Sequence, residues 1–123
     1  MGRFEYLEGE VPDIPCAAAV KTSTHVYVSG TAVFQDEQGN VISDVKDQTC
    51  KCLNKIEQIL SKWDLTRKDI VMVTVFVRGK ENFMGMNEAY RGFFGDVFPS
   101  RTACVSDLGH PDMLVEISCV ACL

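Results

Sequence analysis

The chain has 123 residues, of which 46% are hydrophobic and 24% are charged. This length and composition fit one globular domain over residues 1–123 and exclude collagen-like, low-complexity and wholly disordered proteins. Twelve Lys and Arg against 17 Asp and Glu give a net charge of −5, so nonspecific binding of nucleic acid would work against the average electrostatic field. Nucleic acid is therefore not expected as a partner.

The first part of the chain predicts a strand followed by a helix. Residues 26–34 have the composition of a strand, and the polar stretch 35–40 predicts a turn or the end of that strand. Ser43 and Asp44 can cap a helix in which apolar residues recur at three- and four-residue spacing as far as Trp63. The opposite face of this helix is charged and is expected to face solvent.

The middle of the chain predicts a second strand and a second helix. Residues 69–78 carry the strongest strand signal. Its alternation places four valines on one face: Val71, Val73, Val75 and Val77. Residues 82–94 then predict a helix with an aromatic-rich stripe.

Two more strands are predicted near the end of the chain, at residues 102–106 and 113–121, joined by the turn-rich stretch 107–112. If they pair as an antiparallel hairpin about the middle of that turn, Arg101 lies opposite Glu116 on the same face of the sheet. This register is a hypothesis, because a shift of one residue would move the partner to the other face.

The order of elements predicts an α+β fold, a mixed sheet with two helices packed on one face. The other face would then expose a partly apolar patch in a monomer: Met72, Phe76, Leu114 and Val120. A symmetric oligomer would bury such a patch, so self-association is expected.

Membrane, disulfide and metal roles are not expected. The apolar run at residues 70–77 is far shorter than the roughly 20 residues of a membrane span, and residues 1–10 contain no apolar signal segment. A cytoplasmic protein with reduced thiols at its 6 cysteines is therefore expected. Cys119 and Cys122 would point to opposite faces of a strand, which disfavours zinc, and no motif calls for a cofactor.

Arg101 and Glu116 are the residues that best suit chemistry. A guanidinium held on a sheet can bind a substrate carboxylate through two hydrogen bonds, and a nearby carboxylate can position water and exchange protons with it. The alternative is a structural ion pair between Arg101 and Glu116 at a subunit interface. The residue pattern leaves both interpretations open.

Several collinear segments resemble the Rid family, also called the YjgF family, whose best-known members are the RidA enamine and imine deaminases. The likeness spans most of the chain, and its distinctive ending is Pro99-Ser100-Arg101-Thr102 followed 15 residues after the Arg by Glu116 in an apolar strand. The other matching segments are Val28-Ser29-Gly30, residues 44–63, residues 69–71 with 74–77, Met86-Asn87-Glu88-Ala89-Tyr90 with Phe93-Phe94, and Val115-Glu116-Ile117.

The resemblance implies a chorismate-mutase-like α+β fold assembled as a homotrimer, with sites in the clefts between subunits. By matching motifs, Arg101 resembles the Arg that binds the substrate carboxylate, and Glu116 resembles the acid that helps activate water. Ser29 and Gly30 resemble the segment that lines the pocket. Asn87 and backbone groups near Ala103 are further expected contacts.

The implied reaction is hydrolysis of 2-aminoacrylate, or its tautomer 2-iminopropionate, to pyruvate and ammonia without a metal. Two departures bear on substrate choice: Cys16 stands where RidA-type members carry a Tyr, and Ala103 stands where they carry a Cys. Cys16 could be a reactive thiol in the cleft or an inert buried one. A non-catalytic trimer that binds small carboxylates is the alternative function, and a ribonuclease is less favoured because of the acidic balance.

Overall fold

The structure, a computed structural model, describes residues 3–123. Within this range the chain forms six strands, two α-helices and two short 3-10 helices. Their bounds are β1 Glu5–Leu7, β2 Ala19–Lys21, β3 His25–Thr31, α1 Val45–Ser61, η1 Arg67–Asp69, β4 Ile70–Val77, η2 Lys80–Asn82, α2 Phe83–Phe94, β5 Ser100–Val105 and β6 Val115–Cys122.

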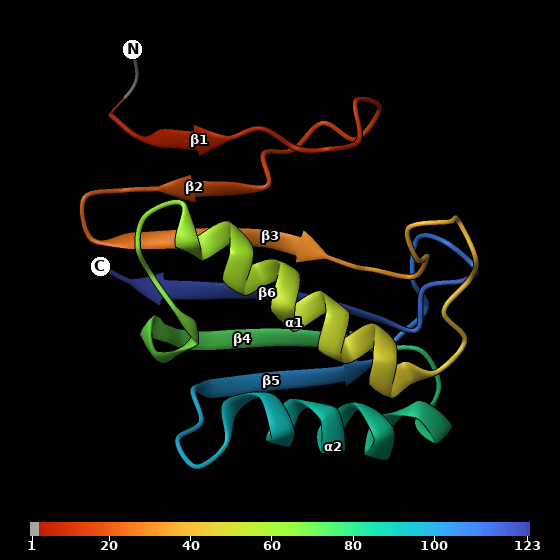
Figure 1. Cartoon of the computed structure of the whole chain (residues 1–123). Coiled ribbons are helices and arrows are strands. Elements are labelled where there is room, and N and C mark those ends of the chain that lie inside the picture. The colour runs from red at the N-terminus through yellow and green to blue at the C-terminus, as the bar shows by residue number, and fades with distance from the viewer. Residues whose placement is uncertain (1–2) are drawn as a thin grey trace.

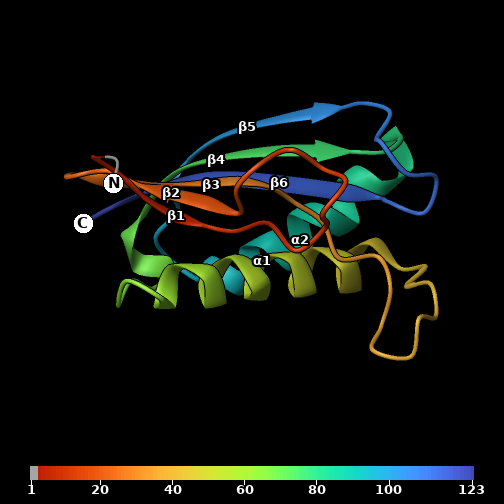
Figure 2. The same ribbon diagram turned by 90° about the horizontal axis from the view of Figure 1, so that it is seen from above.

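The six strands form one sheet in the order β1-β2-β3-β6-β4-β5 (Figure 1). Only β4 and β5 are parallel among these neighbours, because the chain between them returns through α2. Both α-helices pack on the same face of the sheet and leave the other face open (Figure 2). The predicted α+β fold with two helices on one face is confirmed.

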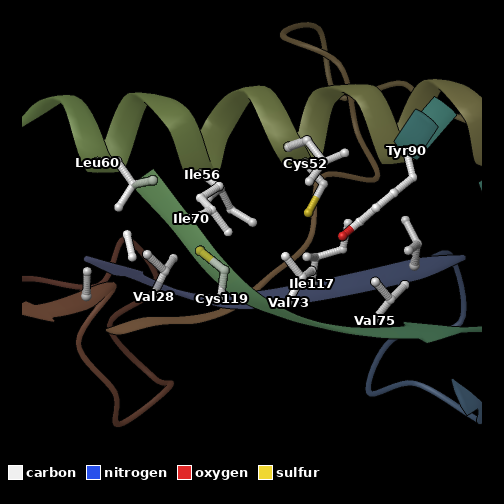
Figure 3. Packing of buried hydrophobic residues seen from close by; sticks show 14 of the residues in the cluster. Val28, Cys52, Ile56, Leu60, Ile70, Val73, Val75, Tyr90, Ile117 and Cys119 are labelled. Atoms are coloured by element: carbon white, nitrogen blue, oxygen red, sulfur yellow. The ribbon is translucent and has the colours of Figure 1, made fainter. Parts of the chain in front are cut away.

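Helix α1 begins where the sequence predicts. The side chain of Asp44 caps it by accepting a hydrogen bond of 2.9 Å from the backbone N–H of Lys46. Cys52, Ile56 and Leu60 then point from α1 toward the sheet and are buried (Figure 3). Burying this apolar stripe against the strands holds the helix in place, since an isolated helix of this length is only marginally stable.

The strand β6 confirms the alternation expected from its sequence. Its four residues on the helix-covered face are buried: Val115, Ile117, Cys119 and Ala121. Glu116, Ser118 and Val120 alternate with them and lie half-buried on the open face. The core therefore lies on one side of β6, and Glu116 lies on the other.

In β4, the prediction that four valines share one face is wrong for Val71, the first of them. Val71 is 46% exposed, whereas the preceding Ile70 is buried in the core. The pairing with β6 shifts register between Ile70 and Met72, which inserts an extra residue into β4 and reverses the alternation there. Val73, Val75 and Val77 are buried as expected.

The predicted hairpin between the last two strands is also wrong. β5 and β6 are not neighbours, because β4 lies between them and pairs with both. Arg101 is opposite Val73 of β4, and Glu116 is opposite Phe76 of β4. Since Val73 and Phe76 face opposite sides of the sheet, Arg101 lies on the helix-covered face and Glu116 lies on the open face.

The sequence reading missed strands β1 and β2, which have only three residues each. The polar turn at residues 35–40 is present and is closed by an isolated antiparallel bridge between Gln35 and Val41. No helix formed by residues 3–123 is long and apolar enough to cross a membrane.

Candidate functional site

Arg101 leaves the edge strand β5 toward helix α2. Its Nη1 donates a hydrogen bond of 2.8 Å to Oδ1 of Asn87 and lies 3.9 Å from the sulfur of Met86. Its guanidinium carbon lies 4.8 Å from the centre of the Tyr90 ring. An amide and an aromatic face thus hold the guanidinium, while most of its N–H groups remain available to a ligand.

A hollow of about 230 Å³ opens beside this guanidinium. Its lining comes from α2 and from the segment that leads into β5: Asn87, Tyr90, Arg91, Phe98, Pro99 and Arg101. A larger hollow of about 540 Å³ lies between α1 and the turn at residues 35–38, but none of the residues expected at the site lines it. The chemistry of the smaller hollow, rather than size, makes it the candidate site.

The backbone of β5 offers further polar groups near Arg101. The N–H of Ser106 donates a hydrogen bond of 2.9 Å to the carbonyl of Val77 in β4. Because backbone groups alternate in direction along a parallel strand, the N–H and C=O of Ala103 then point away from β4 to the free edge of the sheet. Within residues 3–123, no strand therefore pairs with the backbone N–H and C=O of Ala103, the groups expected to contact a ligand.

Glu116 occupies a separate place on the open face of the sheet. A Cβ atom built on Gly30 of β3 would lie 3.0 Å from the carboxyl carbon of Glu116. The pairing of β3 with β6 is irregular between Val28 and Thr31, which places Gly30 at a bulge. A glycine at this bulge leaves the space that the Glu116 carboxylate fills.

Ser29 precedes Gly30 in β3 and is hydrogen-bonded to the segment that carries Cys16. The Ser29 hydroxyl donates a hydrogen bond of 2.7 Å to the carbonyl of Ala17, and its N–H donates one of 3.0 Å to Ala18. These bonds tie β3 to the segment that carries Cys16, whose side chain is exposed. The Ser29 hydroxyl is thus engaged in structure, while the Cys16 thiol is accessible in the single chain.

The residues expected at the site therefore form two groups within one chain. Arg101, Asn87 and the Ala103 backbone lie at the β5 edge beside α2. Glu116 and Gly30 lie together on the open face, next to Ser29. The expectation that Arg101 and Glu116 face one another within a chain is wrong, because the sheet separates their side chains.

Sequence reasoning missed the part that Tyr90, Arg91 and Phe98 play in the hollow. The spacing of Asn87, Tyr90 and Arg91 by three and four residues was the available signal, since such residues share one face of a helix. Burial raises the pKa of Tyr90 to about 12, although the positive charge of Arg101 acts in the opposite direction. Tyr90 is therefore a neutral phenol that serves as a platform.

Within residues 3–123, the cysteines and the potential metal ligands form no second candidate site. All six cysteines are free, and Cys52 and Cys119 are buried. Burial raises the pKa of Cys119 to about 12, so it remains a protonated core side chain. Among the residues that the structure describes, no group of three or more His, Cys, Asp or Glu side chains could hold a metal ion.

Comparison with known proteins places these features in context. The family described as endoribonuclease L-PSP matches residues 12–123. RutC family proteins of Pyrococcus abyssi and Pyrococcus horikoshii are each 31% identical to the chain over 108 residues, which make up 87% of this chain and 85% and 86% of theirs.

Solved structures agree with the observed architecture. A Mycobacterium tuberculosis member of the YjgF/YER057c/UK114 family has a TM-score of 0.84 at 23% identity and covers 98% of this chain and 99% of its own. A Yersinia pestis protein of the Rid family has a TM-score of 0.81 at 27% identity, with coverage of 98% and 99%. The likeness therefore extends over the whole sheet and both helices.

Proposed function

Because the chain belongs to the endoribonuclease L-PSP family, also called the YjgF or Rid family, we propose that it hydrolyses reactive 2-imino and 2-enamine acids. The substrates would be small molecules such as 2-iminopropionate or its tautomer 2-aminoacrylate. The products would be a 2-keto acid and ammonia.

The state of Arg101 is the observation that carries this proposal. Within residues 3–123, its guanidinium makes no ion pair, yet Asn87 and the Tyr90 ring hold it at the edge of a hollow. An arginine held in one place without a carboxylate partner is suited to bind a carboxylate from outside the chain. Arg101 and Glu116 form no ion pair within one chain, so the alternative of a structural pair would require two subunits, as the proposed site does.

The proposal requires a second copy of the chain, because Arg101 and Glu116 lie on opposite faces of one sheet. In a homotrimer with sites between subunits, Arg101 of one chain would share a cleft with Glu116 of its neighbour. The open face supports such assembly, since Met72 and Tyr27 are 48% and 47% exposed there. Burying these side chains against a second copy would favour association.

In such a shared cleft, Arg101 would bind the substrate carboxylate and orient the imine carbon toward a water molecule. Glu116 would accept a proton from that water as its oxygen adds to the C=N bond, and the imine nitrogen would take up a proton. The resulting amino alcohol would then lose ammonia as its hydroxyl proton is removed and the C=O bond forms. Water is the only co-reactant, and no electrons are transferred.

The direct test generates 2-aminoacrylate from serine with a pyridoxal-phosphate-dependent dehydratase and follows the decay of the imine. The wild-type protein should accelerate the decay, and Arg101→Ala should reduce kcat/KM by about 100-fold or more. Arg101→Lys should also lose activity, because an ammonium group cannot form the paired hydrogen bonds or lie flat on Tyr90. Unaccelerated decay with the wild-type protein would contradict the deaminase.

A complementation test examines the shared site. Arg101→Ala and Glu116→Gln chains are co-expressed, so that random trimers leave about a quarter of the sites with Arg101 and Glu116 both intact. Activity should return to about a quarter of the wild-type value. Co-expression of Arg101→Ala with Arg101→Gln is the matched control and should stay inactive. Failure of the first mixture to regain activity would contradict a site shared between subunits.

A non-catalytic trimer that binds small carboxylates is the second candidate. The groups that would bind a carboxylate, Arg101 and Asn87, already lie together in one chain. Cys16 stands where the family usually has a tyrosine, so a group used in turnover could be missing while binding is kept. Binding of 2-oxobutyrate that is lost in Arg101→Ala, without any acceleration of imine decay, would support this candidate over the deaminase.

A further inference from the structure

The hollow beside Arg101 contains a second arginine. Arg91 follows Tyr90 in α2 and lines the same hollow as Arg101. Its guanidinium carbon lies 5.5 Å from the centre of the Phe98 ring. Two arginines therefore line one small hollow, and the guanidinium group of each lies near an aromatic ring.

Neither of these arginines is neutralised by the protein. In the part of the chain that the structure describes, no carboxylate lies within 4.0 Å of the guanidinium nitrogens of Arg91 or Arg101. By contrast, Arg67 meets Glu57 at 2.6 Å. Two unneutralised cations beside one hollow are unexpected in a chain with a net charge of −5.

The remaining lining sets the shape of a suitable ligand. Phe98 and Pro99 supply apolar surface next to the two guanidinium groups, and Asn87 supplies an amide. The volume of about 230 Å³ lies below the range of drug-sized pockets and suits a metabolite of a few carbon atoms. No acidic side chain of the same chain lines the hollow, so the Glu116 carboxylate that a neighbouring subunit would bring to the imine carbon is the one like charge that the proposed site holds.

We propose that Arg91 binds a second carboxylate, so that the preferred substrate is the 2-imino acid of a short dicarboxylic amino acid. This inference rests on the proposed function and specifies its substrate class. The 2-carboxylate would lie on Arg101, the methylene groups would lie on Phe98 and Pro99, and the distal carboxylate would lie on Arg91. A dianion neutralises both guanidinium groups, whereas a monocarboxylate leaves one of them without a counter-charge.

The test compares two imines made in place by amino-acid oxidases: 2-iminosuccinate from aspartate and 2-iminopropionate from alanine. The wild-type protein should show a kcat/KM at least about tenfold higher for 2-iminosuccinate. Arg91→Ala should lower this selectivity ratio at least about tenfold. The matched control is Lys68→Ala, which removes one exposed positive charge elsewhere and should leave the ratio unchanged.

A wild-type ratio near or below one, or a ratio that Arg91→Ala does not move, would overturn the role of Arg91. If neither imine is hydrolysed, the proposed function fails instead, and calorimetric titration then decides the inference separately. The wild-type protein should bind 2-oxoglutarate at least about tenfold more tightly than 2-oxobutyrate, and Arg91→Ala should abolish the difference. Equal affinities in the wild-type protein would overturn the inference.

Discussion

Arg101 and Glu116 lie on opposite faces of one sheet, on strands that flank the same neighbour, β4. The hydrogen-bonded sheet between them is a barrier that no side-chain rotation can remove. Any reaction that uses both groups must therefore take one from each of two chains. Monomeric protein should have neither a complete site nor deaminase activity, so the functional unit we propose is the oligomer.

The close approach of Gly30 to Glu116 predicts a loss of activity without loss of fold. In Gly30→Ala, the new methyl group would lie 3.0 Å from the Glu116 carboxyl carbon, so the carboxylate must move by a few tenths of an ångström. We expect kcat/KM for imine hydrolysis to fall about tenfold, while the free energy of unfolding changes by less than about 1 kcal/mol.

Gly109→Ala is the matched control for this change, because nothing lies within 4 Å of the added methyl group. Its kcat/KM and stability should equal those of the wild-type protein. Unchanged activity in Gly30→Ala would show that the position of Glu116 does not limit the reaction.

The hydroxyl of Tyr90 predicts a stabilising substitution. The residue is 4% exposed, and its hydroxyl oxygen is buried without a hydrogen-bond partner. Figure 3 shows this oxygen directed into the core between α1 and the sheet. Because an unpaired buried polar group is unfavourable by about 1–3 kcal/mol, Tyr90→Phe should leave stability equal or raise it by about 1 kcal/mol.

Urea unfolding at fixed protein concentration measures this effect. Tyr90→Ala is the comparison, since it removes the ring as well and should lower the free energy of unfolding by about 3–5 kcal/mol. Destabilisation in Tyr90→Phe would mean that the hydroxyl forms a favourable interaction in the assembled protein.

Gln48 is a fully buried amide whose hydrogen bonds join α1 to two other segments. Its Nε2 donates bonds of 2.7 Å and 2.9 Å to the carbonyls of Ile42 and Asp112, and its Oε1 accepts one of 2.9 Å from the N–H of Leu114. Gln48→Leu keeps a similar volume but leaves three partly buried backbone groups without their partner. We expect a loss of about 3 kcal/mol or more in the free energy of unfolding.

The control for this prediction is Gln58→Leu, which changes an exposed glutamine of the same helix and should be nearly neutral. Both variants are compared with the wild-type protein by urea unfolding. Equal stabilities of the two variants would contradict the structural role of the Gln48 amide.

The Glu57–Arg67 pair predicts part of the acid sensitivity of the fold. The Arg67 side chain donates hydrogen bonds of 2.6 Å, 3.0 Å and 3.2 Å to the Glu57 carboxylate, and these hold the pKa of Glu57 below its usual value of 4.5. The pKa of Glu57 is lower in the folded state than in the unfolded chain. The pair therefore stabilises the fold fully at pH values above the unfolded-state pKa, and this stabilisation is lost as the pH falls through the folded-state pKa.

We therefore expect the urea midpoint of the wild-type protein to fall from about pH 6 to about pH 3, and Glu57→Gln to reduce that fall. Glu37→Gln is the control, since Glu37 is exposed and forms no ion pair within residues 3–123. An identical pH dependence in Glu57→Gln and the wild-type protein would contradict this contribution.

The parts of the fold that followed from the sequence were those fixed by local pattern. The Asp44 cap and the helical spacing gave α1, and the strict alternation of β6 gave its two faces correctly. The short strands β1 and β2 were missed, because three residues are too few to show a period. The displaced Val71 was missed because a bulge depends on the partner strand as well as on the strand's own residues.

For the candidate site, the sequence predicted which residues take part but not how they are arranged. The motifs identified Arg101 and Glu116, but sequence proximity suggested a hairpin between their strands, whereas the pairing of both with β4 is a long-range property of the sheet. The contact of Arg101 with Asn87 likewise depends on how α2 packs beside β5. The deaminase reaction and the trimer remain predictions, tested by the imine and complementation experiments.

The central position of β6 has a consequence for biosynthesis. It is the last strand along the chain, yet it lies between β3 and β4 in the sheet. A nascent polypeptide stopped before residue 115 would hold two groups of strands, β1-β2-β3 and β4-β5, with no strand that pairs with both. The sheet therefore cannot close until the ribosome has delivered residues 115–122, which pair with both β3 and β4.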